Sequence, residues 1–336
     1  MSEEMERHDD ICDVPGIQVG HDTQAEAATG CTVILCERPA VGAVDVRGGA
    51  PATRETDLLS PTCMMQEVHA IVLAGGSAFG LEAATGVARA LEARGAGYDV
   101  GVARVPIVPT AALFDLGIGR ADVRPDAEAG ARALAAATAG PVAQGCVGAG
   151  TGGTIGKIAG PQLCVKSGIG SASAQVDAML GGYSLGALAA VNAVGDIYDA
   201  ESGALVAGAR DPSGAGWLRD AAPHTGPWAA PQIGANTTLA VIATDAPLNK
   251  ADLTKLAQMA HDGFALAIRP THTPFDGDLI FALSTAPAAA SAGPAPLALL
   301  AQLGALASLA VARAIVRGVR AATTLAGVPA LRDLSF

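Results

Sequence analysis

The junction between Asn236 and Thr237 offers the clearest chemistry in this 336-residue chain. A glycine-led turn there runs directly into a strand-like segment, residues 234–242. If the Thr237 hydroxyl attacks the Asn236 carbonyl, the peptide bond becomes an ester, and hydrolysis then leaves a free α-amine beside the hydroxyl. Nucleophile and base would belong to one residue. The same residues also fit an ordinary strand start, because polar turn residues often precede β-branched ones.

Four more side chains could serve such a centre. Lys157 lies in a glycine-rich apolar stretch, where a lysine is either a surface charge or a functional cation. Asn192, in an apolar run, either satisfies backbone groups or donates to an oxyanion. Asp276 and Asp278 alternate just before a strand, so both can face one side. They could orient an amine and a hydroxyl, or form a solvated turn. No histidine and cysteine spacing suggests zinc, and two carboxylates are thin evidence for other metals, so we expect no metal or cofactor.

Two glycine motifs suggest other chemistries. Residues 182–186 satisfy the Gly-x-Ser-x-Gly pattern of a serine α/β-hydrolase, with Ser184 as the nucleophile. That elbow requires a preceding strand, and residues 175–181 do not form a convincing one. Residues 148–153 match Gly-x-Gly-x-x-Gly, but no helical pattern follows, so a phosphate-binding turn is not favoured. These glycines fit better as positions where backbone approaches a catalytic centre.

The elements that must position these residues alternate between strand and helix patterns, which predicts an α/β fold with helices covering stacked sheets. Asn249 caps one expected helix, and residues 199–231 and 286–296 resemble surface loops. The other expected elements are a strand at 70–73, a helix from 77 to about Arg94, a helix from Asp126 to Gly140, and strands at 238–244 and 279–283.

Composition narrows the possible functions. Half of the residues are hydrophobic, which favours a folded chain with a substantial core. The net charge of −11 and the lack of a Lys/Arg cluster argue against a nucleic-acid partner. The start of the chain has no secretory pattern and the six cysteines form no Cys-x-x-Cys pair, so we expect a cytoplasmic protein with reduced thiols. Residues 294–312 are apolar enough to suggest a membrane span, but their one-sided pattern favours a buried helix and no membrane partner.

Several ordered motifs together resemble a known family, the self-processing L-aminopeptidase/D-esterases. β-Peptidyl aminopeptidases and 6-aminohexanoate-oligomer (nylon-oligomer) hydrolases are among its members. The resemblance covers roughly residues 15 to 325, and the order of the motifs is far more specific than any single one. They are Val46-Arg47-Gly48-Gly49, Arg54-Glu55-Thr56, residues 73–83, Phe114-Asp115, Gly156-Lys157, Val191-Asn192, Asn236-Thr237-Thr238 and Asp276-Gly277-Asp278.

This resemblance implies a four-layer α/β/β/α sandwich like that of N-terminal nucleophile hydrolases. It implies a single domain, 1–336, that cleaves itself into an α-chain (1–236) and a β-chain (237–336) which stay associated, in a homo-oligomer of tetramer size or larger. Thr237 would be the catalytic nucleophile, with Lys157 and Asn192 beside it. Asp276 and Asp278 would lie near the new amine.

The implied reaction is hydrolysis of a small peptide or other amide through an acyl-enzyme. The Thr237 amine would take the hydroxyl proton, and Asn192 with backbone amides would stabilise the oxyanion. One departure concerns Phe114, because certain members place a tyrosine at this position and this chain therefore lacks that hydroxyl. The alternatives are a serine α/β-hydrolase using Ser184, or a non-catalytic protein with the family fold.

Overall fold

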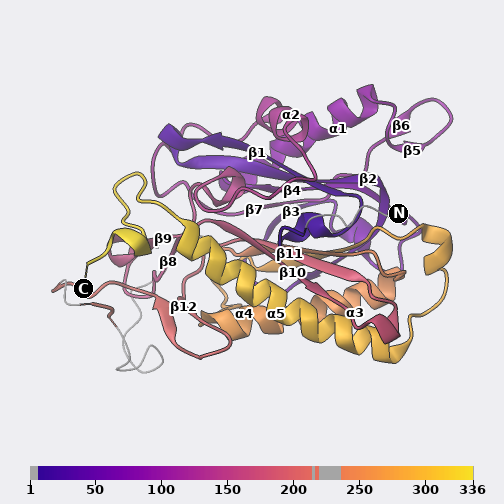
Figure 1. Cartoon of the computed structure of the whole chain (residues 1–336). Helices are drawn as coiled ribbons and strands as arrows, with labels where there is room; N and C mark the ends of the chain where they lie inside the picture. The colour runs from indigo at the N-terminus through magenta and orange to yellow at the C-terminus, as the bar shows by residue number, and fades with distance from the viewer. Residues whose placement is uncertain (1–6, 214–215, 219–235, 336) are drawn as a thin grey trace.

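The computed structural model describes residues 7–213, 216–218 and 236–335. Its main feature is a nine-stranded mixed sheet between two groups of helices (Figure 1). The strand β1 (Ile17–Gln24) pairs with β2 outside the main path. Along that path the strands are β10 (Ile169–Gln175), β11 (Ser184–Ala190), β14 (Leu239–Thr244), β16 (Leu279–Ser284), β2 (Thr29–Val46), β4 (Glu67–Ala74), β7 (Thr110–Ala112) and β3 (Ala52–Arg54).

Three separate hydrophobic clusters show that the sheet folds over itself into two layers. Side chains along a strand alternate between faces, so one strand can supply two clusters. In β14, Val241 enters the cluster between the sheet layers, whereas Ile242 enters the cluster under the C-terminal helices. In β4, Ile71 enters the same inter-sheet cluster, and Val72 packs beneath the other helices. Three interlayer spaces make four layers, which confirms the predicted α/β/β/α arrangement.

The strand β2 joins the two layers, because it is 18 residues long and its pairing with β4 shifts between Leu35 and Ala40. Before the shift, Val33 packs on the N-terminal pair of helices, and after it Val41 and Ala43 pack under the C-terminal ones. The two layers are therefore parts of one hydrogen-bonded sheet. The sequence predicted stacked sheets but gave no sign of this shared strand.

In the part of the chain that the structure describes, five α-helices cover the two outer faces. The helix α1 (Ala83–Ala93) lies over β4 and α2 (Ala127–Ala135) lies over β1 and β2, and the two helices also pack on each other. The opposite face carries α3 (Lys250–Ala260), α4 (Asp262–Ala267) and α5 (Leu297–Ala321), and α5 crosses β10 and β11 (Figure 1). The shorter strands are β5 (Tyr98–Asp99), β6 (Arg104–Val105), β8 (Thr154–Ile155), β9 (Val165–Lys166), β12 (Asp196–Tyr198), β13 (Leu205–Ala207) and β15 (Ile268–Arg269).

Helix-capping residues in the sequence predicted most helix ends correctly. The Asn249 side chain caps α3 by accepting from the Asp252 N–H at 2.9 Å, and Asp126 caps α2 in the same way through Ala129. The expected end of α2 at Gly140 is wrong. Thr138 instead pairs with Val19 of β1 through two backbone hydrogen bonds, and this long-range pairing stops the helix after Ala135.

The predicted buried helix within residues 294–312 is part of α5. This helix is long and apolar enough to cross a membrane by length and composition alone, but 61% of its most apolar window is buried inside the protein. Leu303, Ala307 and Val311 are completely buried in the cluster that α5 shares with the sheet and with α3 and α4. Its hydropathy is thus explained by packing on β10 and β11.

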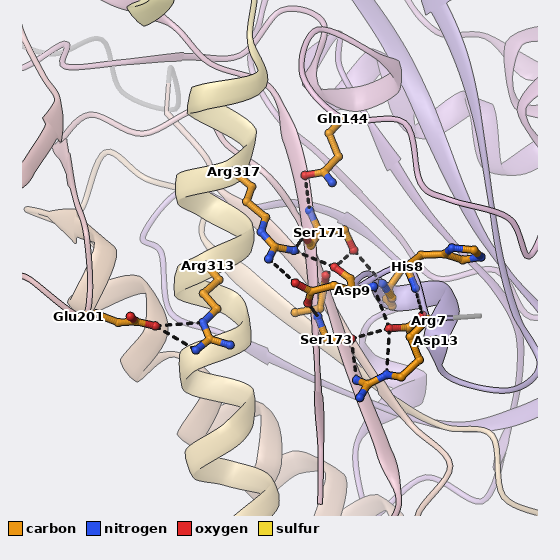
Figure 2. A network of polar contacts seen from close by, with 12 residues as sticks. Arg7, His8, Asp9, Asp13, Gln144, Ser171, Ser173, Glu201, Arg313 and Arg317 are labelled. Carbon is orange, nitrogen blue, oxygen red and sulfur yellow. Dashed lines mark hydrogen bonds and ion pairs between the residues drawn. The ribbon is translucent and has the colours of Figure 1, made fainter. Parts of the chain in front are cut away.

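A polar network ties the start of the chain to α5 (Figure 2). We call it the N-terminal network. Arg317 of α5 donates to the backbone oxygens of Asp9 (2.7 Å) and Ser171 (2.9 Å) and also pairs with the Asp9 carboxylate. The Ser173 hydroxyl donates to Asp13 at 2.6 Å, and the Arg7 guanidinium lies 3.7 Å from the same carboxylate. The network therefore joins segments on both sides of residue 237.

Candidate active site

One edge of the sheet gathers the residues that the sequence singled out. The strand β11 runs antiparallel to β14, which runs parallel to β16, and Ala190, Leu239 and Leu279 are aligned across the three strands. The C-terminal end of β11 therefore meets the N-terminal ends of β14 and β16. Asn192, Thr237 and the segment 276–278 lie directly beyond these aligned positions.

Thr237 is buried, with only 2% of its surface exposed. Its hydroxyl donates to the carbonyl oxygen of Asn236 at 2.5 Å, and the Gly277 N–H donates to the same oxygen at 2.9 Å. The Thr237 N–H donates to the backbone oxygen of Asn192 at 2.8 Å. The carbonyl that precedes the threonine is thus polarised by a backbone amide while the hydroxyl lies beside it.

Gly277 must be glycine for this approach. A Cβ atom there would lie 2.6 Å from the Thr237 hydroxyl oxygen and 2.8 Å from the backbone oxygen of Ala50. Both distances are shorter than real Cβ contacts allow. Gly48 has the same role one strand away, since its Cβ would meet the backbone of residues 276–278 at 2.3 to 2.7 Å. Two glycines of the quoted motifs therefore allow backbone to close around the threonine.

Lys157 and Asn192 form a connected pair beside the junction. The Lys157 ammonium donates to the Asn192 side-chain oxygen at 2.7 Å and to its backbone oxygen at 3.3 Å. That backbone oxygen also accepts the Thr237 N–H, so one carbonyl links the lysine to the nitrogen of the threonine. The Asn192 amide nitrogen donates to the backbone oxygen of Phe114 at 2.8 Å. Position 114 thus contributes its backbone, although it lacks a hydroxyl.

The two carboxylates differ in their partners. Asp276 accepts from the Thr273 N–H (2.8 Å) and hydroxyl (2.6 Å). Asp278 accepts from the Thr238 N–H at 2.7 Å with one oxygen. Its other oxygen accepts from the Thr271 hydroxyl at 3.0 Å and lies 2.9 Å from His272 Nδ1. Asp278 therefore holds the backbone directly after the threonine.

Burial moves the charges of this cluster toward neutrality. It lowers the pKa of Lys157 to about 7, although nearby Cys164 and the Asp276 and Asp278 carboxylates oppose the shift. Burial, followed by repulsion from Asp278, raises the pKa of Asp276 to about 6. Both groups can exchange protons near neutral pH, which is the property that acid–base catalysis needs.

A cavity of about 450 Å³ opens beside Lys157. The Phe114 ring, Thr154 and Arg210 are among its lining residues. Asp115 also lines it, but both carboxylate oxygens are engaged, by the Gly76 N–H and the Thr29 hydroxyl, and burial raises the pKa of this group to about 6. The space is large enough for a small amide, and it reaches the lysine of the cluster.

The structure brings together all the residues predicted for the junction, and their catalytic roles stay predictions. The turn residues Gly234 and Ala235, like residues 214–215 and 219–231 of the expected loop at 199–231, lie outside the described residues. Sequence reasoning missed Gly277 as a donor and gave His272 no role in this cluster. The alternation Asp-Gly-Asp could have pointed to Gly277, because a glycine between two buried carboxylates permits close backbone approach.

The serine-hydrolase alternative does not fit the structure. Ser184 begins β11, and a 3₁₀ turn at Ala178–Leu180 precedes it. A nucleophile elbow needs the reverse order, with a strand before the serine and a helix after it. The glycines at 148–153 also form no phosphate-binding turn, since they pack against other backbone. A Cβ at Gly150, for example, would lie 2.2 Å from the nitrogen of Ile169.

The layered α/β/β/α sheet is the fold of a class of amide-bond hydrolases, the N-terminal nucleophile (Ntn) type. Solved structures support this class. A β-aminopeptidase of Burkholderia sp. has a TM-score of 0.71 at 25% identity, covering 97% of this chain and 91% of that one. An L-aminopeptidase D-Ala-esterase/amidase from Ochrobactrum anthropi, described as a new variant of the Ntn hydrolase fold, has a TM-score of 0.73 at 20% identity, covering 98% and 90%.

The chain belongs to peptidase family S58, because the sequence model of that family matches residues 9–331. An uncharacterized aminopeptidase of Mycobacterium tuberculosis (strain ATCC 25618 / H37Rv) is 44% identical over 348 residues, which cover 96% of this chain and 97% of the relative. A 6-aminohexanoate-oligomer endohydrolase of Kocuria sp. (strain KY2) is 32% identical over 278 residues, covering 81% and 74%. These relatives confirm the resemblance drawn from the ordered motifs.

Proposed function

We propose that this protein is a self-processing N-terminal-threonine amide hydrolase. The observation that carries the proposal is the geometry at the junction. The Thr237 hydroxyl and the Gly277 N–H both bond the carbonyl oxygen of Asn236, and the threonine nitrogen is already held by Asn192. Attack at this carbonyl would place the oxyanion on the Gly277 amide, which is the arrangement that stabilises tetrahedral intermediates.

In the first stage, the bond between Thr237 Oγ1 and the Asn236 carbonyl carbon forms as the bond to the Thr237 nitrogen breaks. The neutral fraction of Lys157, whose pKa burial lowers to about 7, takes the hydroxyl proton and returns a proton to the leaving nitrogen. Water then cleaves the ester. The Asn236 side-chain oxygen is buried and has no hydrogen-bond partner among the described residues, so it can accept from this water.

In the mature stage, the new amine stays near the Asn192 oxygen and takes the hydroxyl proton as Oγ1 attacks a substrate amide. The product amine leaves, an acyl-enzyme remains, and water releases the acid. Asp276 and Asp278 keep the amine and the following backbone in place. The cavity beside Lys157 holds part of the substrate. The α-chain and β-chain stay associated through the sheet.

Intact-mass spectrometry of the purified protein tests the proposal. We expect fragments of about 23 and 10 kDa, in proportion to the 236 and 100 residues on either side of the bond. Thr237→Ala should remain intact and inactive. Thr238→Ala is the matched variant, because the Thr238 hydroxyl is also buried but has no hydrogen-bond partner among the described residues. It should still cleave, and so should Ser184→Ala.

A substrate panel completes the test, since similar proteins in this family are named for different activities. Aminoacyl p-nitroanilides, β-peptides and 6-aminohexanoate oligomers should be assayed on the processed protein and on Thr237→Ala. Hydrolysis of at least one class by the processed protein alone is the expected result. A chain that stays intact yet hydrolyses amides would overturn the threonine mechanism, and an intact chain without hydrolysis would favour a non-catalytic protein.

A further inference from the structure

Two hydrogen-bonded histidines, His272 and His261, lead away from the cluster on the side of Asp278. His272 lies on the loop after β15, and its Nδ1 is 2.9 Å from Asp278 Oδ2. Its Nε2 is 3.1 Å from Nδ1 of His261, a side chain with no exposed surface at the end of α3. His261 Nε2 in turn lies 3.1 Å from the backbone oxygen of Asp45 and 3.4 Å from its carboxylate. Phe264 packs against both imidazole rings.

The number of hydrogens needed for the contacts from Asp45 through the two histidines to Asp278 fixes the total number of protons that these groups carry. Both ends, Asp45 and Asp278, are acceptors, so the three contacts between them need three N–H hydrogens. Two neutral imidazoles supply only two, because each neutral ring carries one N–H. One extra proton must therefore be present, either on the two histidines or on Asp278.

The surroundings place this proton on His272. Both Asp278 oxygens already act as acceptors: Oδ1 accepts from the Thr238 N–H, and Oδ2 accepts from the Thr271 hydroxyl and the His272 backbone N–H. Burial lowers the pKa of His261 to about 4, and the neighbouring His272 adds to that shift, so His261 stays neutral. His272 keeps 17% of its side chain exposed, so water can help to solvate its charge. Among the described residues, Asp278 faces His272, and Asp45 and Arg47 face His261; Asp276 and Lys157 interact with Asp278 from the side of the cluster.

We propose that His272 is a positioning residue which acts as an imidazolium. Its Nδ1–H holds the Asp278 carboxylate, and Asp278 in turn holds the Thr238 N–H next to the nucleophile. The inference rests on the proposed function of Thr237. It adds a pH dependence with a definite sign: when rising pH removes the extra proton, two acceptors face each other, Asp278 loses its partner, and the nucleophile loses its alignment.

Nuclear magnetic resonance on the full protein with ¹⁵N-labelled histidine tests the proton directly. At pH 7, both ring nitrogens of His272 should give the signals of protonated nitrogens, and His261 should show one neutral tautomer. His272→Asn assigns the resonances by difference. A neutral His272 at this pH would overturn the inference, and this readout does not depend on cleavage or activity. It therefore separates failure of the inference from failure of the proposed hydrolase function.

Kinetics on the processed enzyme test the consequence. His272→Phe should lower kcat/KM by about tenfold to a hundredfold, by analogy with hydrogen-bond partners that orient metal-ligating side chains. His272→Asn can keep an N–H toward Asp278 that does not titrate, so it should recover most of that loss and abolish the fall in activity on the alkaline side. The matched variant His69→Gln changes a buried histidine of β4 outside the cluster and should leave the pH profile unchanged. An alkaline fall that persists in His272→Asn would contradict the proposal.

Discussion

The N-terminal network and the cluster around Thr237 both join residues before position 237 to residues after it, but they treat charge in opposite ways. In the network (Figure 2), partial burial raises the pKa of Asp9, but hydrogen bonds from Arg317 and Ser173 and the charges of Arg317 and Arg313 together lower it further, so the carboxylate stays ionised. In the cluster, burial outweighs the attraction between Lys157 and the carboxylates, so the pKa of Lys157 falls and that of Asp276 rises. The first arrangement stabilises charges, and the second makes them easy to neutralise. A cluster of hydrogen-bonded charged side chains therefore does not by itself identify a catalytic site; the direction in which their pKa values shift is also needed.

The largest difference between the regions should come from removing the lysine of the cluster. Lys157→Met keeps the length of the side chain but removes the group that exchanges protons near neutral pH. We expect processing and hydrolysis to slow by about 10² to 10⁴, the usual range for acid–base groups. Intact-mass time courses and initial rates measure this change. The exposed Lys255→Met in α3 should leave both rates within twofold; equal losses in the two variants would remove the distinction.

Asp276→Asn should improve stability while it lowers activity. The raised pKa of about 6 means that the folded protein holds this proton more tightly than the unfolded chain does. The stability from this group is complete below the ordinary pKa near 3.8 and is lost as pH rises through about 6. The amide removes that loss, so at pH 8 the free energy of unfolding should rise by about 2 kcal/mol.

Urea unfolding at pH 5 and pH 8 measures the effect, with Thr237→Ala as the background so that the chain stays in one piece. The gain should appear at pH 8 and shrink at pH 5. A loss of stability at both values would show that Asp276 is held as a structural ion.

In the N-terminal network, the corresponding substitution of Asp9 should lower the free energy of unfolding, where the substitution of Asp276 raises it. The lowered pKa of Asp9 means that its contribution is present above the ordinary pKa and is lost as pH falls through the lower folded value. Asp9→Asn should therefore destabilise the Thr237→Ala protein at pH 7 by about 1 kcal/mol, because the pair is largely exposed. In the wild-type background, the kcat of the processed enzyme should stay unchanged. A large fall in kcat would mean that the network belongs to the active site.

The smallest effect is expected beside that network, where Arg313 of α5 pairs with Glu201 at 2.9 Å (Figure 2). Both side chains are about half exposed or more, so solvent screens the pair. Glu201→Gln should change the free energy of unfolding by less than about 0.5 kcal/mol. The same urea titration sets the background against which the Asp9 effect is judged. A change as large as that of Asp9→Asn would erase the contrast between this isolated pair and the pair that belongs to the N-terminal network.

Much of the fold follows from local signals in the sequence. Asn249 and Asp126 cap helices because their short polar side chains accept from nearby N–H groups, and this depends on a few neighbouring residues alone. Features set by distant contacts could not be predicted in this way. The end of α2 depends on pairing between Thr138 and Val19, and the path of β2 through both layers depends on strands far along the chain.

The same division holds for the site. The types and order of Asn192, Thr237, Asp276 and Asp278 could be identified from the sequence, since each lies next to a strand-like run. The polarising Gly277 amide and the histidine chain depend on how the 270–277 loop returns to the sheet edge, which no local pattern specifies. Lys166 is a further example: it is completely buried and donates to the backbone oxygens of Gly153 and Ser167 at 2.7 Å, yet nothing in its neighbourhood marks it as interior.

The strand order has a consequence for how the protein could refold before and after cleavage. The strands β14 and β16, which follow Thr237, are inserted between β11 and β2, which precede it. While the chain is continuous, this insertion is a first-order folding event. Once the bond at residue 237 is cut, the same sheet could be rebuilt only by the meeting of two separate polypeptides, at a rate that depends on their concentration. Cleavage would leave the folded structure almost unchanged but would make refolding slower, because the two fragments would have to meet first. The lifetime of the folded mature protein would therefore depend more on slow unfolding than on fast refolding.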